Sequence, residues 1–261
     1  MPEVVILGCG YTGRRAAERM LRGGHRVMVT VRNPSLVEDL RKFGARVVEF
    51  DLAQPGGLEI PNGALVLHSI PGFATQLFAR MTGQPHRVVY LSTTGVYGAT
   101  RDVDETTSPA PDTESGKQRL AVEEEVRGRP WSSLVLRPAA IYGPGRGIHV
   151  SMREGRFQLA GTGDNFVSRI HVDDLAAHAE AALLSEVTGA YPVGDELPCT
   201  SREIAEYCAQ LLDVAMPPPV SRDTLHETRR ADRRVDGGAI RRLLNLTLQY
   251  PTYREGIAAS V

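Results

Sequence analysis

Short apolar runs alternate with segments of helical spacing along the first half of the chain. The runs predict buried strands at residues 4–7, 25–31, 45–50, 64–68, 87–92 and 133–136. The segments between them predict helices at residues 14–21, 35–43, 73–81 and 116–126. Continuous apolar strands that alternate with helices are typical of a parallel sheet covered on both faces. The pattern therefore predicts an α/β fold with a doubly wound parallel sheet.

The second half of the chain loses this regular alternation. A strand is predicted at residues 166–171, and Asp173 is a favourable N-cap for a helix at residues 175–184. The irregular segments around these elements indicate a small substrate lobe that is interleaved with the end of the sheet. We expect the sheet domain to cover residues 1–142 and 166–195, and the small C-terminal lobe to cover residues 143–165 and 196–261.

A glycine-rich turn follows the first predicted strand. Its glycines, Gly8, Gly10 and Gly13, have the spacing G-x-G-x-x-G and precede a predicted helix. Strand, G-x-G-x-x-G and helix together are the context of the dinucleotide-binding turn in a Rossmann fold, where a diphosphate meets the N–H groups at the start of the helix. We therefore predict that this turn, with Tyr11 and Thr12 inside it, binds a dinucleotide. A glycine turn without a ligand is the alternative.

The end of the second predicted strand bears on the choice of dinucleotide. Arg32 stands there, and no carboxylate follows until Glu38. A carboxylate near this place binds the ribose 2′-hydroxyl of NAD, whereas a guanidinium suits the 2′-phosphate of NADP. Arg32 thus favours NADP(H) over NAD, with an ordinary surface arginine as the alternative. Further candidate cofactor contacts at strand ends are Asp51, which could equally form a simple turn, and His68 and Ser69.

Composition narrows the classes of function. The chain of 261 residues carries 31 acidic and 30 basic residues, a balance that does not favour nucleic acid or anionic membranes as partners. Its three cysteines lie far apart without histidines at ligand spacing, so neither a disulfide framework nor a metal site is predicted. No apolar run approaches membrane-span length, and Glu3 stands where a signal peptide would be basic. We expect a cytoplasmic protein that binds a small-molecule substrate, and homodimer formation is left open.

Four motifs occur in a fixed order along the chain. After the glycine turn come L-S-T-T-G-V-Y-G at residues 91–98, L-R-P-A-A-I-Y-G-P-G at residues 136–145 and R-I-H-V-D-D-L-A at residues 169–176. Together they resemble the NAD-dependent epimerase/dehydratase family, the extended short-chain dehydrogenase/reductases. The resemblance covers the chain to about residue 195 and implies a nicotinamide cofactor and often a nucleotide-sugar substrate. Family members usually carry G-x-x-G-x-x-G, but Leu7 precedes Gly8 here, which indicates an atypical branch similar to the nucleoside-diphosphate-sugar epimerases.

The resemblance also implies candidate catalytic residues. In the family a tyrosine acts as general acid/base, a lysine four residues later lowers its pKa, and a Ser/Thr orients the substrate oxygen. Thr93 matches the Ser/Thr, with Thr94 beside it, although both could simply bond their own loop. The alignment places Ser115 on the tyrosine and Arg119 on the lysine. Because serine is a far weaker acid than tyrosine and arginine stays charged, the resemblance leaves the proton transfer unassigned.

Other side chains could take part if the protein is an enzyme. Candidates for a replacement acid are Tyr97, Tyr142 and His171, each with a packing or hydrogen-bonding role as the alternative. Candidates for binding an anionic substrate are Arg137, Arg169 and the C-terminal group Arg229, Arg230, Arg233 and Arg234, for which a solvated charged face is the alternative. The leading interpretation is an NADP(H)-binding oxidoreductase or epimerase-like enzyme acting on a carbonyl or hydroxyl of a small, anionic, nucleotide-sugar-like substrate. The rival interpretation is a non-catalytic NADP(H)-binding sensor or regulatory protein.

Overall fold

A seven-stranded parallel sheet forms the centre of the computed structural model, which describes residues 1–72, 76–225 and 231–261. The strands are ordered β14-β9-β7-β5-β1-β2-β3. Their bounds are β1 (Val4–Leu7), β2 (Val27–Val31), β3 (Arg46–Glu49), β5 (Leu65–His68), β7 (Arg87–Leu91), β9 (Ser132–Pro138) and β14 (Gly189–Val193). This order confirms the predicted doubly wound Rossmann sheet, and the direction of winding changes between β1 and β5.

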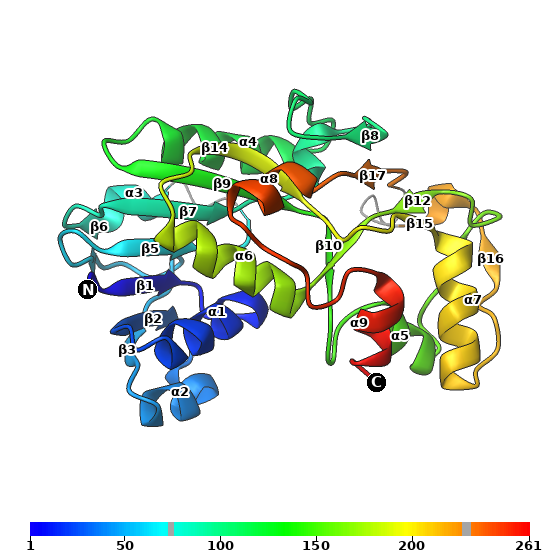
Figure 1. Cartoon of the computed structure of the whole chain (residues 1–261), viewed down its shortest axis with the longest axis horizontal. Helices are drawn as coiled ribbons and strands as arrows, with labels where there is room; N and C mark the ends of the chain where they lie inside the picture. The colour runs from blue at the N-terminus through cyan, green and yellow to red at the C-terminus, as the bar shows by residue number, and fades with distance from the viewer. Residues whose placement is uncertain (73–75, 226–230) are drawn as a thin grey trace.

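Helices cover both faces of the sheet because each presents one apolar side to it (Figure 1). On one face, α1 (Tyr11–Arg22), α2 (Glu38–Lys42) and α6 (Val172–Leu184) close a buried cluster with alternate side chains of the strands. On the other face, α3 (Gln76–Arg80) and α4 (Glu114–Arg127) close a second cluster. The strands are therefore buried on both sides, which is why they appear in the sequence as continuous apolar runs.

A smaller group of helices lies beyond the carboxyl end of the sheet (Figure 1). It consists of α5 (Ile148–Arg153), α7 (Ser201–Leu212) and α9 (Tyr253–Ala258), which share a buried cluster of their own. The helix α8 (Gly238–Leu243) instead returns to the sheet and packs against β14. Part of the predicted C-terminal lobe thus belongs to the core of the sheet domain. None of the helices in the described residues has the length and apolar character needed to cross a membrane.

Short strands and 3-10 turns complete the described chain. The strands are β4 (Leu58–Glu59), β6 (Met81–Thr82), β8 (Asp102–Val103), β10 (Ala140–Tyr142), β11 (Leu159–Ala160), β12 (Phe166–Val167), β13 (Arg169–His171), β15 (Cys199–Thr200), β16 (Pro219–Val220) and β17 (Arg234–Val235). The 3-10 turns are η1 (Pro34–Val37), η2 (Thr94–Tyr97) and η3 (Arg222–Thr224). Through β17, which pairs with β8, the C-terminal segment reaches the carboxyl edge of the sheet.

Three predicted elements differ from the structure. The strand predicted at 166–171 is divided into β12 and β13, and the helix predicted at 35–43 is the turn η1 followed by the shorter α2. Helix α6 begins at Val172, so Asp173 is not its N-cap. His171 takes that place, because its ring Nδ1 accepts a hydrogen bond from the Asp173 N–H at 3.2 Å. For the helix predicted at 73–81, residues 73–75 lie outside the described residues.

Candidate active site

The glycine turn lies at the carboxyl end of β1, where the winding of the sheet changes. Gly8 has a φ of +87°, and a Cβ there would lie 2.9 Å from the Ile70 side chain. A Cβ on Gly13 would lie 2.3 Å from the carbonyl oxygen of Gly8, so α1 packs directly on the turn. By contrast, within the described part of the chain no atom beyond Gly10 and its chain neighbours lies within 4 Å of the Cβ position of Gly10. The turn therefore needs Gly8 and Gly13 for its shape, while Gly10 leaves the backbone open to a ligand.

The start of α1 is suited to an anion. The first N–H groups of a helix have no acceptor within the helix and carry a partial positive charge. Here the N-cap is Gly10, none of the described side chains caps the helix, and its first turn, beginning at Tyr11, has no acidic residue. A phosphate group can accept hydrogen bonds from these N–H groups without displacing a side chain of the protein.

The Ser69 side chain supports the turn, and the His68 side chain is buried behind it. The Ser69 hydroxyl donates to the carbonyl oxygens of Gly8 at 2.6 Å and Leu7 at 3.2 Å. The His68 side chain has no exposed surface, and its ring lies 4.7 Å from that of Tyr90. Burial, with the Arg119 charge as a smaller contribution, lowers the pKa of His68 to about 3. The Ser69 side chain thus supports the turn, and the burial of His68 lends no support to the prediction that His68 contacts the cofactor.

Arg32 is exposed at the end of β2, as a phosphate ligand would require. Its guanidinium forms no hydrogen bond or ion pair with the described residues. Neighbouring Arg14, in contrast, pairs with Glu18 at 3.1 Å and also with Asp39. Asp51 uses its Oδ1 to accept a hydrogen bond from the Ala53 N–H at 3.0 Å, so it forms a simple turn after β3. Among the residues predicted to contact the cofactor, Arg32 is therefore a positive charge that no described residue pairs.

Three of the four predicted catalytic residues lie together around a cavity of about 670 Å³. Thr93 and Thr94 follow β7 at the carboxyl edge, and Ser115 stands in the first turn of α4. The α4 terminus packs closely on η2, because a Cβ on Gly116 would lie 2.8 Å from the carbonyl oxygen of Gly95. This contact brings the Ser115 hydroxyl to the same cavity as the two threonines.

Arg119 lies apart from the cavity. Its Nη1 donates to the Tyr90 hydroxyl at 3.1 Å and approaches the Leu91 carbonyl oxygen at 3.5 Å. The guanidinium is therefore directed at the end of β7, and it is absent from the cavity lining. The structure brings Thr93, Thr94 and Ser115 together but does not bring Arg119 to them.

The opposite wall of the cavity comes from the C-terminal segment. Arg233 donates to the carbonyl oxygens of Thr94 at 2.7 Å and Thr100 at 3.1 Å, and also to that of Gly98. These bonds hold the loop that carries Thr93 and Thr94, so the guanidinium of Arg233 is not free for a substrate. The neighbouring Arg234 pairs with Asp102 at 3.4 Å. Of the predicted C-terminal arginine group, Arg229 and Arg230 lie outside the described residues.

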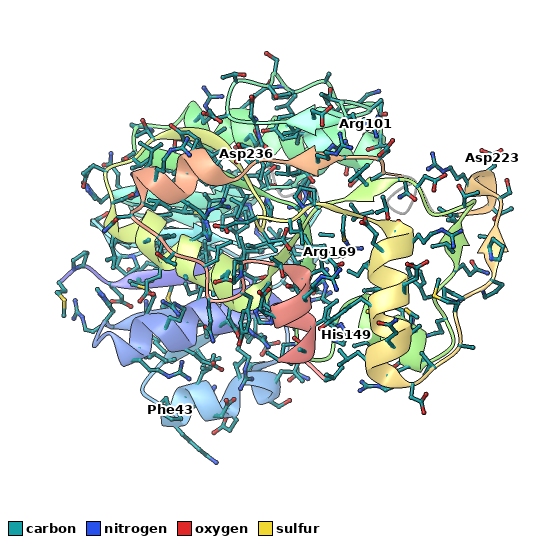
Figure 2. The ribbon with its side chains drawn as sticks, turned by 45° about the vertical axis from the view of Figure 1, so that its right-hand side comes forward. Phe43, Arg101, His149, Arg169, Asp223 and Asp236 are labelled. Atoms are coloured by element: carbon teal, nitrogen blue, oxygen red, sulfur yellow. The ribbon has the colours of Figure 1, made fainter. Side chains whose placement is uncertain are left out.

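The other candidate arginines are buried and bonded. Arg137 forms an ion pair with Glu123 at 2.7 Å and donates to the Tyr97 hydroxyl at 3.1 Å. Arg169, labelled between the sheet and the small lobe in Figure 2, donates to the Val167 carbonyl oxygen at 3.0 Å. Both guanidiniums support the structure, and the prediction that they meet an anionic substrate finds no support here.

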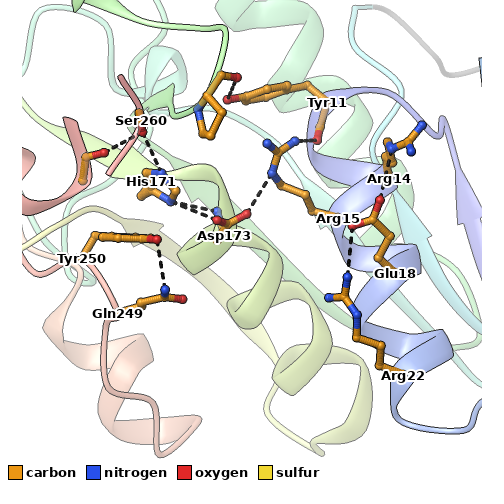
Figure 3. Close-up of polar contacts among 12 residues, drawn as sticks. Tyr11, Arg14, Arg15, Glu18, Arg22, His171, Asp173, Gln249, Tyr250 and Ser260 are labelled. Carbon is orange, nitrogen blue, oxygen red and sulfur yellow. Dashed lines mark hydrogen bonds and ion pairs between the residues drawn. The ribbon is translucent and has the colours of Figure 1, made fainter. Parts of the chain in front are cut away.

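None of the three candidate replacement acids lines the cavity. Tyr97 has no exposed surface, and burial raises the pKa of its phenol. Burial also raises the pKa of Tyr142, which packs beneath α9. Burial lowers the pKa of His171 to about 4, and this ring caps α6 and contacts Ser260 at 3.3 Å (Figure 3). All three side chains therefore have structural roles.

Comparison with known proteins agrees with this arrangement. The model of the NAD dependent epimerase/dehydratase family matches residues 72–194, and that of the TrkA-N domain matches residues 4–60. Ceramide reductase of Caulobacter vibrioides is 28% identical over 207 residues, which are 74% of this chain and 64% of that protein. The chain spans between a third and just under two thirds of the length of the curated relatives it matches.

Solved structures share the fold over nearly the whole chain. A functionally unknown conserved protein from Silicibacter pomeroyi is 30% identical, with a TM-score of 0.81, and the match covers 99% of this chain and 98% of that one. MoeE5 in complex with UDP-glucose and NAD is 19% identical, with a TM-score of 0.76 and coverage of 99% and 97%. Motifs, sheet order and these matches agree: residues 72–194 match the NAD-dependent epimerase/dehydratase family model, and the whole chain shares the Rossmann fold of these structures.

Proposed function

We propose that the protein is an NADP(H)-dependent oxidoreductase or epimerase-like enzyme that acts on a carbonyl or hydroxyl group of a small substrate. The cavity at the end of β7, where Thr93, Thr94 and Ser115 meet, carries this proposal. It lies at the carboxyl edge of the sheet, the edge that also holds the glycine turn, and ligands of such folds bind along this edge. A relative named as a reductase and a structural neighbour that holds UDP-glucose and NAD support the same chemistry.

The hydroxyl groups of the cavity would act on the substrate oxygen. A bound nicotinamide supplies or accepts the hydride in this chemistry. Thr93 Oγ1 accepts the Gly95 N–H at 3.1 Å, which leaves the hydroxyl hydrogen free to be donated to a substrate oxygen. The Ser115 hydroxyl has no hydrogen bond to another described residue, so it can donate as well. Two donors would polarise a carbonyl, and because both are weak acids the proton would come from water.

The charges around the cavity bear on the substrate. Among the described residues that line it, Asp112 and Asp232 are acidic, and the guanidinium of Arg233 is bound to carbonyl oxygens. These residues offer no unpaired cation to an anionic group. We therefore propose that the reacting part of the substrate is uncharged, as the sugar of a nucleotide sugar can be, with any phosphate outside the cavity.

Replacing Thr93 with valine is expected to lower turnover roughly 100-fold, as loss of a donor to a developing oxyanion does. The reaction is measured by the absorbance of the reduced nicotinamide with a panel of aldehydes, ketones and nucleotide sugars. Thr100→Val, in the same loop but outside the cavity lining, is the control and should keep full activity. Equal turnover of Thr93→Val and the wild type would remove Thr93 from the reaction.

A non-catalytic NADP(H)-binding protein is the second candidate function. It is favoured by the lack of a tyrosine, histidine or lysine among the described residues that line the cavity. A wild-type protein that binds the nucleotide but turns over none of the panel would support this alternative.

We propose NADP(H) as the preferred cofactor because Arg32 is exposed and unpaired at the end of β2. The Arg32→Asp variant is expected to reverse the preference, since one charged hydrogen bond contributes about 1.5–3 kcal/mol, or roughly 10- to 150-fold in affinity. Dissociation constants for NADP⁺ and NAD⁺ provide the measurement. The control is Arg26→Asp, because Arg26 is also exposed but directly precedes the start of β2, away from Arg32. An unchanged ratio of the two constants in Arg32→Asp would refute this assignment.

A further inference from the structure

A second glycine-rich loop, residues 143–147, presses on the start of α1. Gly143 has a φ of +150°, and a Cβ there would lie 2.8 Å from the Tyr11 hydroxyl and 2.7 Å from the Val172 side chain. The Tyr11 hydroxyl donates to the carbonyl oxygen of Pro144 at 3.0 Å (Figure 3). The loop is therefore held against the residue that directly follows Gly10 in the dinucleotide turn.

Two guanidiniums lie over the Tyr11 ring, and they differ in whether a carboxylate neutralises them. Arg15 lies 4.5 Å from the ring centroid, and it pairs with Asp173 at 2.8 Å (Figure 3). Arg146, from the loop, lies 5.4 Å from the centroid and is exposed. Its side chain forms no ion pair with any residue that the structure describes. The loop thus holds one uncompensated positive charge beside the first residue of α1.

We infer that Arg146 binds the diphosphate of the dinucleotide, an inference that rests on the proposed use of NAD(P). The diphosphate carries two negative charges, and the helix start supplies N–H groups but only a partial charge. A guanidinium adds a full charge and two parallel donors. Its contact with Tyr11 already restricts the side chain, so less entropy is lost when the ligand binds.

The position of Arg146 separates it from the other cofactor contacts. Arg32 directly follows β2, on the side of β1 where the 2′-phosphate is proposed to lie. Arg146 comes from the loop between β10 and α5, which contacts the starts of α1 and α6. The two arginines approach from different elements, so loss of each should affect different parts of the nucleotide.

Titration with NADP⁺, NAD⁺ and ADP-ribose tests the inference, because all three contain the diphosphate. Arg146→Ala is expected to weaken the binding of all three by a similar factor, about 10- to 150-fold, and to leave their ratios unchanged. Arg146→Lys should retain part of the affinity, whereas Arg146→Met, which keeps the length but not the charge, should behave like alanine. Arg127→Ala, an exposed arginine at the far end of α4, is the control.

The outcomes separate this inference from the proposed function. Unchanged affinities in Arg146→Ala, with normal binding by the wild type, would overturn the inference alone. A loss of affinity confined to NADP⁺ would place Arg146 at the 2′-phosphate. A loss of affinity for NADP⁺ and NAD⁺ but not for ADP-ribose would place it at the nicotinamide half. Either result would also overturn the inference. A wild type that binds none of the three would instead overturn the proposed function.

Thermal unfolding without nucleotide should be the same for every variant, since Arg146 is exposed. A large drop in stability for Arg146→Ala alone would assign the residue a structural role and overturn the inference.

Discussion

Replacing Glu123 with alanine is expected to lower the free energy of unfolding by about 3–5 kcal/mol, the usual cost of leaving a buried charge without its partner. The carboxylate of Glu123 accepts three hydrogen bonds from Arg137 and one from the Ser92 hydroxyl. The side chains of the pair are only 5% and 1% exposed, so water cannot replace the lost contacts without opening the core. Thermal or denaturant unfolding measures the loss.

Two further variants define the cause of that loss. Glu124→Ala, at the exposed neighbouring position of α4, should change the free energy of unfolding by no more than about 0.5 kcal/mol. Glu123→Leu combined with Arg137→Met removes both charges and should recover much of the stability lost in Glu123→Ala. A loss below about 1 kcal/mol for Glu123→Ala would show that the pair contributes little to the fold.

The Gly13→Ala variant is expected to lose both stability and nucleotide affinity. The added Cβ would meet the Gly8 carbonyl oxygen at 2.3 Å and the Ser69 hydroxyl at 2.8 Å, and the backbone atom cannot move without shifting the turn. Overpacking of this kind costs about 1–3 kcal/mol. Nucleotide binding should weaken at least about tenfold, because the start of α1 moves away from the turn. Thermal unfolding and titration with NADP⁺ measure the two effects.

Gly10→Ala is the matched comparison within the same turn. No other described residue except the chain neighbours of Gly10 comes within 4 Å of the new Cβ, so the free energy of unfolding should stay within about 0.5 kcal/mol of the wild-type value. The methyl group would instead occupy the space where the diphosphate approaches the backbone, and affinity should fall. Wild-type affinity in Gly10→Ala would contradict the proposed position of the diphosphate.

The strands of the sheet could be predicted because burial on both faces leaves a direct mark in the sequence. β1 and β5 are short continuous apolar runs, and each lies where the pattern predicts a strand. The doubly wound parallel sheet could be predicted from the alternation of these runs with helices, whereas the order of its strands comes from the structure. The start of α6 could not be predicted in the same way, because aspartate is a favoured N-cap residue type and histidine is not, yet His171 takes this place in the folded backbone.

The cavity was predictable only in part. Thr93 matches a motif of a known family, and Ser115 stands where the family carries its tyrosine, so both could be found by resemblance. Arg233 was named only as a candidate for binding an anion, and its role in holding the loop could not be predicted, because its carbonyl partners lie 133 to 139 residues away and no periodic pattern connects them. The pairing of Arg137 with Glu123 was likewise hidden, and Arg137 looked available to a substrate until its burial was known.

The direct test of one continuous NADP(H) site is a crystal structure of the protein with NADP⁺ bound. We expect the diphosphate on the N–H groups at the start of α1, the 2′-phosphate beside Arg32, and the nicotinamide C4 at the cavity that Thr93 and Ser115 line. A nucleotide bound with its nicotinamide away from this cavity, or no nucleotide at the glycine turn under saturating conditions, would contradict the account.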